Sequence, residues 1–213
     1  ANGSLVLKLY YTRNSYTLTL NKGTGIATVT GAGTYKFGAS VTIDATMSSG
    51  YDWSKWTSGS TNVTTTKNYT FTMPANNLTY TANTTPHGYT VTYDAKTNGG
   101  STANQTKTVA YGASVDLSLT ATKDGWTFVG WNTDKSAKAK LNSYTMPASN
   151  VTLYAIFSKV LTGAFKYYND KTQNVTVTIY NTATSGSITA PAALGTPSGY
   201  TFRHWSTANT ANA

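Results

Sequence analysis

An aromatic signature of fixed spacing occurs three times in this chain. Each copy has a glycine, two aromatic residues separated by one position, and a tryptophan three positions further on. The copies are Gly50-Tyr51-x-Trp53-x-x-Trp56, Gly125-Trp126-x-Phe128-x-x-Trp131 and Gly199-Tyr200-x-Phe202-x-x-Trp205. Their closing tryptophans are 75 and then 74 positions apart. Such regularity indicates an internal repeat, which constrains the fold more than any local pattern does.

The repeat unit is about 73 residues long, which exceeds the roughly 20–50 residues of a solenoid repeat. A segment of about 70 residues can just enclose a hydrophobic core of its own. We therefore expect a tandem array of separately folded modules that forms an elongated, monomeric chain. We also expect the chain to be a fragment, because its sequence starts and stops inside a repeat.

Apolar residues alternate with threonine in short segments along the chain. Tyr16–Leu20, Tyr89–Tyr93 and Ser40–Ile43 follow this pattern, as does Ser114–Leu119. Alternation with period two predicts half-buried strands. No segment has a sustained helical period, so at most one helical turn per module is expected, before the aromatic signature. The predicted fold class is mainly β, with small α+β, β-grasp-like modules.

The repeated landmarks divide the chain into four segments. Residues 1–15 are expected to hold the closing strand of a preceding module, at Leu5–Tyr11. The first module is assigned to residues 16–85, the second to 86–159 and an incomplete third to 160–213. Asn83–Gly88 is expected to be a short linker. Two further strands, Gly163–Tyr168 and Asn174–Tyr180, are expected to open the third module, and Asn150–Phe157 to close the second.

The polarity of the chain comes from hydroxyl and amide groups rather than from ions. Charged residues make up 11% of it, and the net charge is +9. All seven acidic residues are Asp, and cysteine is absent, which excludes disulfides and thiolate metal sites. No apolar run is long enough for a transmembrane helix. This composition is typical of an extracellular β-protein.

The aromatic signature is interpreted as a set of core anchors. Exposed tryptophans could instead form a stacking platform for sugars or bases. The same spacing in each module favours the core, because a small domain needs large apolar side chains at fixed points. The predicted anchors are Trp53, Trp56, Trp126, Phe128, Trp131, Phe202 and Trp205.

The chain is poorly supplied with catalytic groups. The two histidines, His87 and His204, are not repeated between modules, and the aspartates are scattered. We therefore predict no enzymatic activity, no cofactor and no metal. A Lys–Asn cross-link of the kind found in some bacterial surface domains needs a neighbouring carboxylate, which Asp44 or Asp116 would have to supply. Strand alternation predicts that both of these face solvent.

One loop concentrates positive charge, since Lys135, Lys138 and Lys140 lie close together there. Excess positive charge attracts anionic polymers, although dispersed lysines are also typical of a solvated surface. This loop is the predicted contact for an anionic polymer. No motif indicates specific binding of nucleic acid.

The second module resembles a known family in the order and spacing of its residues. The matching segments are Tyr89–Asp94, Asn98-Gly99-Gly100, Tyr111-Gly112, Asp124–Trp131, Tyr144–Pro147 and Val151–Ala155. Together they resemble a Listeria–Bacteroides repeat, the B-repeat type of internalin B. The first module resembles the divergent form of this repeat, and the third matches only from Gly199 to Trp205.

The resemblance implies β-grasp-like repeats in large secreted or wall-anchored bacterial proteins, with no catalytic residues. The predicted function is therefore a stalk or spacer at the cell surface, with weak adhesion to an unknown host or cell-wall ligand. The alternative is a multivalent adhesin for glycans or anionic wall polymers. Its candidate aromatics are Tyr10, Tyr11, Tyr167 and Tyr168.

Overall fold

The computed structural model describes residues 3, 7–166, 171–190 and 198–199, and it is built from strands. No helix occurs among these residues, so the predicted helical turn before the aromatic signature is not formed there. In the first repeat, strand β4 fills most of that interval instead. The strands are β1 (Ser15–Lys22), β2 (Ile26–Thr30), β3 (Gly33–Lys36), β4 (Ser40–Met47), β5 (Tyr51–Ser58), β6 (Thr61–Thr64), β7 (Tyr69–Thr72), β8 (Leu78–Pro86), β9 (Gly88–Asp94), β10 (Gln105–Ala110), β11 (Thr127–Asn132), β12 (Val151–Lys166) and β13 (Thr172–Tyr180).

The first repeat is made of two sheets, with strand orders β3-β1-β8-β5-β6 and β2-β4-β7. Its first and last strands, β1 and β8, lie side by side and parallel, with Leu18 opposite Leu78. The predicted alternation holds on β4, where Val41 and Ile43 are buried and Ser40 and Thr42 are exposed. Both sheets supply side chains to one core, which also contains Trp56 and Met73. Burial of these apolar side chains is the main driving force for the fold.

The second repeat keeps only one of these sheets. Its strand order is β10-β9-β12-β11, so the opening and closing strands are again neighbours. The counterpart of the β2-β4-β7 sheet is reduced to a single bridge between Ser114 and Thr145. The strand predicted at Ser114–Leu119 is therefore wrong. A side chain interrupts it: Asp116 Oδ1 accepts hydrogen bonds from the Ser118 N–H at 2.9 Å and the Ser118 hydroxyl at 2.6 Å. Local bonds of this kind compete with a β-ladder.

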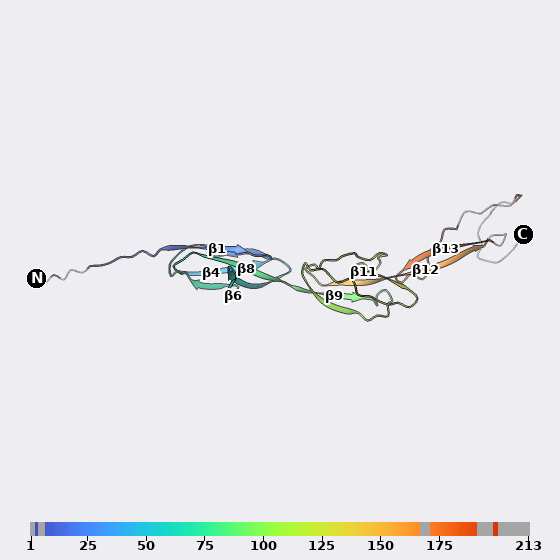
Figure 1. Ribbon diagram of the computed structural model, residues 1–213, viewed down its shortest axis with the longest axis horizontal. Helices are drawn as coiled ribbons and strands as arrows, with labels where there is room; N and C mark the ends of the chain where they lie inside the picture. The colour runs from blue at the N-terminus through green and yellow to red at the C-terminus, as the bar shows by residue number, and fades with distance from the viewer. Residues whose placement is uncertain (1–2, 4–6, 167–170, 191–197, 200–213) are drawn as a thin grey trace. The chain divides into compact units, whose positions relative to one another are not determined.

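The strands continue through both expected boundaries between modules. Four residues of the expected linker, 83–86, form the end of β8, and only His87 separates β8 from β9. Strand β12 runs unbroken from Val151 to Lys166 and pairs antiparallel with β13 (Figure 1). The strand that closes the second repeat is thus the one that opens the next segment. The strand expected at Asn174–Tyr180 is confirmed as part of β13.

The segment before β1 carries no strand in its described part. Residues 7–14 have no regular secondary structure, and the side chains of Leu7, Leu9, Tyr10 and Tyr11 are exposed. The closing strand expected at Leu5–Tyr11 is therefore wrong over residues 7–11. A strand needs a partner for its backbone N–H and C=O groups, and no described strand pairs with this segment.

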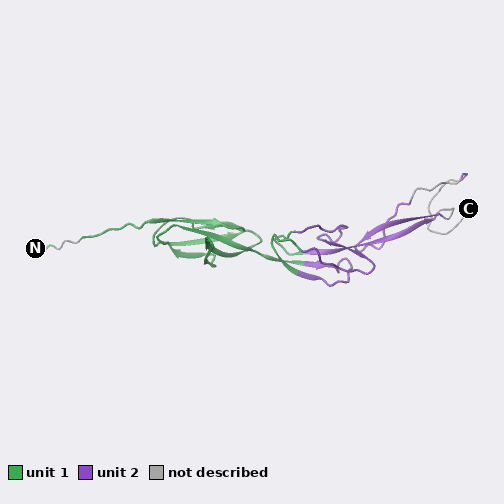
Figure 2. Ribbon diagram, viewed as in Figure 1, with its two compact units in different colours: residues 1–91, 107–115, 145–151 green, residues 92–106, 116–144, 152–213 purple. Residues whose placement is uncertain are grey.

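The chain divides into two compact units (Figure 2). Unit 1 comprises residues 1–91, 107–115 and 145–151, and unit 2 comprises residues 92–106, 116–144 and 152–213. Unit 1 therefore contains the first repeat, the residues before it and three short segments of the second repeat, residues 89–91, 107–115 and 145–151. No helix among the described residues is long and apolar enough to cross a membrane.

Candidate functional site

The closing tryptophan of the signature is buried in each described repeat, and its indole N–H donates to a main-chain carbonyl 11 or 12 residues away. Trp56 is 0% exposed and Trp131 is 3% exposed. The Trp56 indole N–H donates to the Lys67 carbonyl at 2.9 Å, and the Trp131 indole N–H donates to the Leu119 carbonyl at 2.6 Å. Each ring thus supplies apolar area to the core and satisfies its own polar atom.

The other aromatic residues of the signature are only half-buried. Trp53 lies 5.4 Å from the Trp56 ring, and Phe128 lies 5.5 Å from the Trp131 ring, centroid to centroid. Trp126 is covered by a cation, since Lys123 Nζ lies 3.9 Å from its ring centroid. Phe202 and Trp205 lie outside the described residues. How much each side chain stabilises its repeat stays a prediction.

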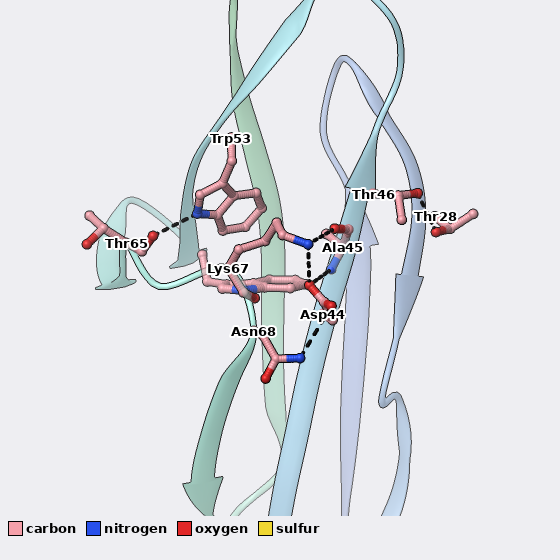
Figure 3. Close-up of polar contacts among 9 residues, drawn as sticks. Thr28, Asp44, Ala45, Thr46, Trp53, Thr65, Lys67 and Asn68 are labelled. Carbon is pink, nitrogen blue, oxygen red and sulfur yellow. Dashed lines mark hydrogen bonds and ion pairs between the residues drawn. The ribbon is translucent and has the colours of Figure 1, made fainter.

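Asp44, Lys67 and Asn68 meet on the surface of the first repeat (Figure 3). Lys67 Nζ lies 2.9 Å from Asp44 Oδ1 and 3.0 Å from the Ala45 carbonyl oxygen. Asn68 Nδ2 donates to Asp44 Oδ2 at 3.3 Å. The hydrogen bond from Lys67 is the main reason that the pKa of Asp44 is lowered. The Asp44 side chain is 35% exposed, so it faces solvent only in part.

The geometry of this cluster fits an ion pair rather than a cross-link. Lys67 and Asn68 are adjacent in the sequence, so an amide bond between them would join no distant segments. Amide formation also needs a carboxylic acid that can donate a proton, whereas the lowered pKa keeps Asp44 ionised. The pair instead connects strand β4 to the loop before β7. Asp116, the other candidate carboxylate, is exposed and accepts from Ser118.

Residues of the two repeats meet within unit 1. The Tyr51 and Tyr111 rings pack edge to face, with centroids 5.3 Å apart. Gly50 has a φ of 87°, and a Cβ there would lie 2.6 Å from the Tyr111 ring. His87 Nδ1 lies 2.7 Å from Asp52 Oδ2, and the His87 carbonyl accepts from the Tyr111 N–H at 2.8 Å. Only glycine combines this φ with so close an approach.

Unit 2 contains a groove beside the lysine loop, which we call the lysine groove. Its volume is about 640 Å³, and it is lined by Thr97, Asn98, Lys135, Ser136, Lys138 and residues 177–183 and 185–187. Lys135 and Lys138 are both exposed and line it, whereas Lys140 does not. Two of the three lysines predicted to contact an anionic polymer thus lie together beside this groove.

Comparison with protein families matches both repeats. Residues 16–87 match the divergent InlB B-repeat domain, and residues 89–156 match the Listeria-Bacteroides repeat domain. The chain belongs to this B-repeat family. The resemblance inferred from the sequence is therefore confirmed for both repeats. No curated protein and no solved structure matches the chain.

B-repeats of this type are typical of extracellular bacterial surface proteins. Within the described residues, no group of three or more His or Asp side chains could hold a metal ion. Every buried side-chain nitrogen or oxygen there has a hydrogen-bond partner.

Sequence reasoning missed two buried asparagines. Asn98 lies in the second B-repeat, and Asn181 directly follows strand β13. Asn98 is 4% exposed and Asn181 is 6% exposed. Asn98 stands in an Asn-Gly-Gly turn, which signals a loop but not a buried amide. Asn181 adopts a left-handed φ of 56°, which asparagine tolerates better than most residues. A single asparagine after an alternating strand carries no signal in the sequence.

Proposed function

We propose that the two B-repeats form a spacer segment of a bacterial surface protein and carry no catalytic centre. A spacer requires that consecutive repeats are joined by connections that resist bending. The observation that best supports this role is the connection between the first and second B-repeats.

This connection is a strand rather than a flexible linker. Only His87 lies between β8 and β9, and its N–H donates to the Gly50 carbonyl at 2.8 Å. Its carbonyl in turn accepts from Tyr111, whose ring packs on Tyr51. Bending at His87 would therefore break two backbone hydrogen bonds and an aromatic contact. Such contacts restrain the chain at the point where the first repeat ends and the second begins.

Small-angle X-ray scattering of the whole chain tests the proposal. The radius of gyration should clearly exceed the roughly 17 Å of a compact chain of 213 residues. Tyr111→Ser should broaden the distribution of interatomic distances, because it removes the aromatic contact at the junction. Tyr10→Ser changes an exposed tyrosine outside the junction and serves as the control. A radius near the compact value would rule out the spacer.

One observation favours the alternative function, a module that binds glycans or anionic wall polymers. The lysine groove is large enough for a ligand and is lined by two cations. The tyrosines proposed for this function give less support: Tyr10 and Tyr11 are exposed in a segment without regular structure, and Tyr167 and Tyr168 lie outside the described residues.

A further inference from the structure

The lysine groove has the size of a ligand site. Its volume of about 640 Å³ falls within the range of roughly 300–1,000 Å³ that is usual for pockets that bind small molecules. All the residues that line it belong to unit 2. One wall is the loop that carries Lys135 and Lys138, and the other is the end of β13 with the segment after it.

The wall that carries Lys135 and Lys138 is fixed by hydrogen bonds from the two buried asparagines. Asn98 Nδ2 donates to the carbonyls of Lys135 and Ala155, both at 2.9 Å. Asn181 Nδ2 donates to the carbonyls of Lys135 at 3.1 Å and Ala137 at 2.9 Å. These bonds fix the main chain of the loop while the side chains of Lys135 and Lys138 remain exposed. A preorganised loop loses less conformational entropy when a ligand binds.

In the opposite wall, the segment after β13 packs onto β13 through a glycine, Gly186. A Cβ on Gly186 would lie 2.9 Å from side-chain atoms of both Val177 and Ile179. This close approach keeps the neighbouring hydroxyl groups of Ser185 and Ser187 beside the strand. The wall therefore presents hydroxyl groups over a partly apolar base.

The charge of the groove is positive. Lys135 and Lys138 are the charged residues among those that line it, and no carboxylate lines it. The nearby Asp134 is outside the lining, and its Oδ1 accepts from the Ser136 N–H at 2.8 Å and the Ser136 hydroxyl at 2.6 Å. Those two bonds already occupy one oxygen of the only carboxylate in this loop.

We propose that the lysine groove binds an anionic glycan, a short oligosaccharide with carboxylate groups. The ammonium groups of Lys135 and Lys138 would meet the carboxylates, since each is a compact charge with three donors. Serine and threonine hydroxyls both donate and accept hydrogen bonds, as sugar hydroxyls do. This binding site goes beyond the spacer role, which requires no groove.

The lining favours a carboxylate sugar over a phosphate polymer. Phosphate sites commonly include the N-terminus of a helix. The described residues contain no helix, and the cations that line the lysine groove are the single ammonium groups of Lys135 and Lys138. Hydroxyl groups predominate beside the two lysines, which suits a ligand rich in hydroxyls with single negative charges.

An NMR titration of the whole chain tests the proposal. The probes are an oligogalacturonate, a neutral malto-oligosaccharide and poly(glycerol phosphate). The oligogalacturonate should shift the amide signals of residues 97–98, 135–138 and 177–187. The double variant Lys135→Ser/Lys138→Ser should bind it about tenfold more weakly or worse, because it loses two charge-assisted contacts. The double variant Lys140→Ser/Lys159→Ser removes the same charge outside the groove and should stay within about twofold of the unchanged chain.

A second variant tests the shape of the groove without changing its charge. Gly186→Ala should displace the wall from Val177 and Ile179 and weaken binding severalfold, while the signals of the first B-repeat stay in place. Unchanged binding by this variant would overturn the proposal, as would equal losses in the two double variants. No binding by the unchanged chain, equal binding of the neutral sugar or tighter binding of the phosphate polymer would do the same. None of these outcomes bears on the scattering test of the spacer.

Discussion

The first and second B-repeats differ most in the segment that follows the Gly-Ala-Ser turn. In the first, Ser40–Met47 is strand β4 and pairs with both β2 and β7. In the second, the equivalent segment forms one bridge at Ser114 and is otherwise irregular. Both segments alternate apolar and polar residues, so the hydrophobic pattern does not account for the difference.

Side-chain hydrogen bonds replace the missing ladder in the second repeat. The Tyr93 hydroxyl donates to the Asp116 carbonyl at 2.6 Å, and the Trp131 indole donates to the Leu119 carbonyl at 2.6 Å. The Thr122 N–H donates to the Thr102 hydroxyl at 2.8 Å. One family fold can thus satisfy the same backbone groups with a strand or with side chains. Burial of the closing tryptophan is common to both solutions.

Removing the closing tryptophan should have the largest effect. Trp56→Ala and Trp131→Ala should each lower the free energy of unfolding by about 3–5 kcal/mol, because each leaves a large cavity. Urea denaturation measures the loss. Trp126→Ala, at a half-buried ring, should cost about half as much or less. A small loss at Trp131 beside a large one at Trp56 would mean that the two repeats do not share an anchor.

Alanine in place of the glycine of the signature should destabilise the first repeat more than the second. Gly50 and Gly125 both have positive φ, but the atom nearest a Cβ is Tyr111 Cδ1 at 2.6 Å for Gly50 and Lys159 Nζ at 3.7 Å for Gly125. Gly125→Ala should cost about 1–2 kcal/mol for the left-handed backbone alone. Gly50→Ala should lower the free energy of unfolding by about a further 1–3 kcal/mol, because the added Cβ would overpack against the Tyr111 ring. Equal shifts in the two thermal melts would show that the Tyr111 ring yields freely.

Acidification should affect the first repeat through Asp44. Its pKa is lower in the folded chain than in the unfolded chain, so the ion pair stabilises the fold above about pH 4. That contribution is lost as the pH falls through the lowered folded pKa. The loss should stay below about 1 kcal/mol, because the pair is more than one-third exposed and solvent screens it. Denaturation between pH 2 and 5, roughly the range that brackets the transition, measures it. Asp44→Asn should remove this component of the pH dependence.

Replacing Asp116 should have the smallest effect on stability. It tests directly why the second repeat lacks a counterpart of strand β4. Asp116 occupies the position of Thr42, whose hydroxyl lies 2.7 Å from the Thr70 hydroxyl on β7. Asp116→Thr removes the acceptor of the Ser118 N–H and should change the free energy of unfolding by about 0.5 kcal/mol or less. Hydrogen exchange of the Leu117 and Leu119 amides should slow if the segment becomes a strand. Unchanged exchange would mean that the Asp116 side chain is not what interrupts the ladder.

Sequence reasoning succeeded where a pattern is local and repeated. Alternation predicted the strands at Tyr16–Leu20 and Tyr89–Tyr93, because side chains on a strand point to opposite faces in turn. It failed at Ser114–Leu119, where the bond from Ser118 to Asp116 outweighed the alternation. It also failed over residues 7–11 of the strand expected at Leu5–Tyr11, with which no described strand pairs.

The candidate site was predictable only in part. The clustering of Lys135 and Lys138 was visible in the sequence, because the two residues are close along the chain. The groove was not, since its other wall comes from β13, about forty residues later, and from the segment that Gly186 packs onto that strand. Likewise, nothing in the sequence pairs Asp44 with Lys67 across the strands of the first repeat.

The sequence by itself determined the family, the repeat and the mainly β fold of this protein, because spacing and alternation are properties of neighbouring residues along the chain. Tertiary structure decided which strands form, how the repeats are joined and where the groove lies. These depend on contacts between distant segments, such as Tyr51 with Tyr111 and Asn181 with the Lys135 carbonyl. Such contacts exist only once burial has brought the segments together.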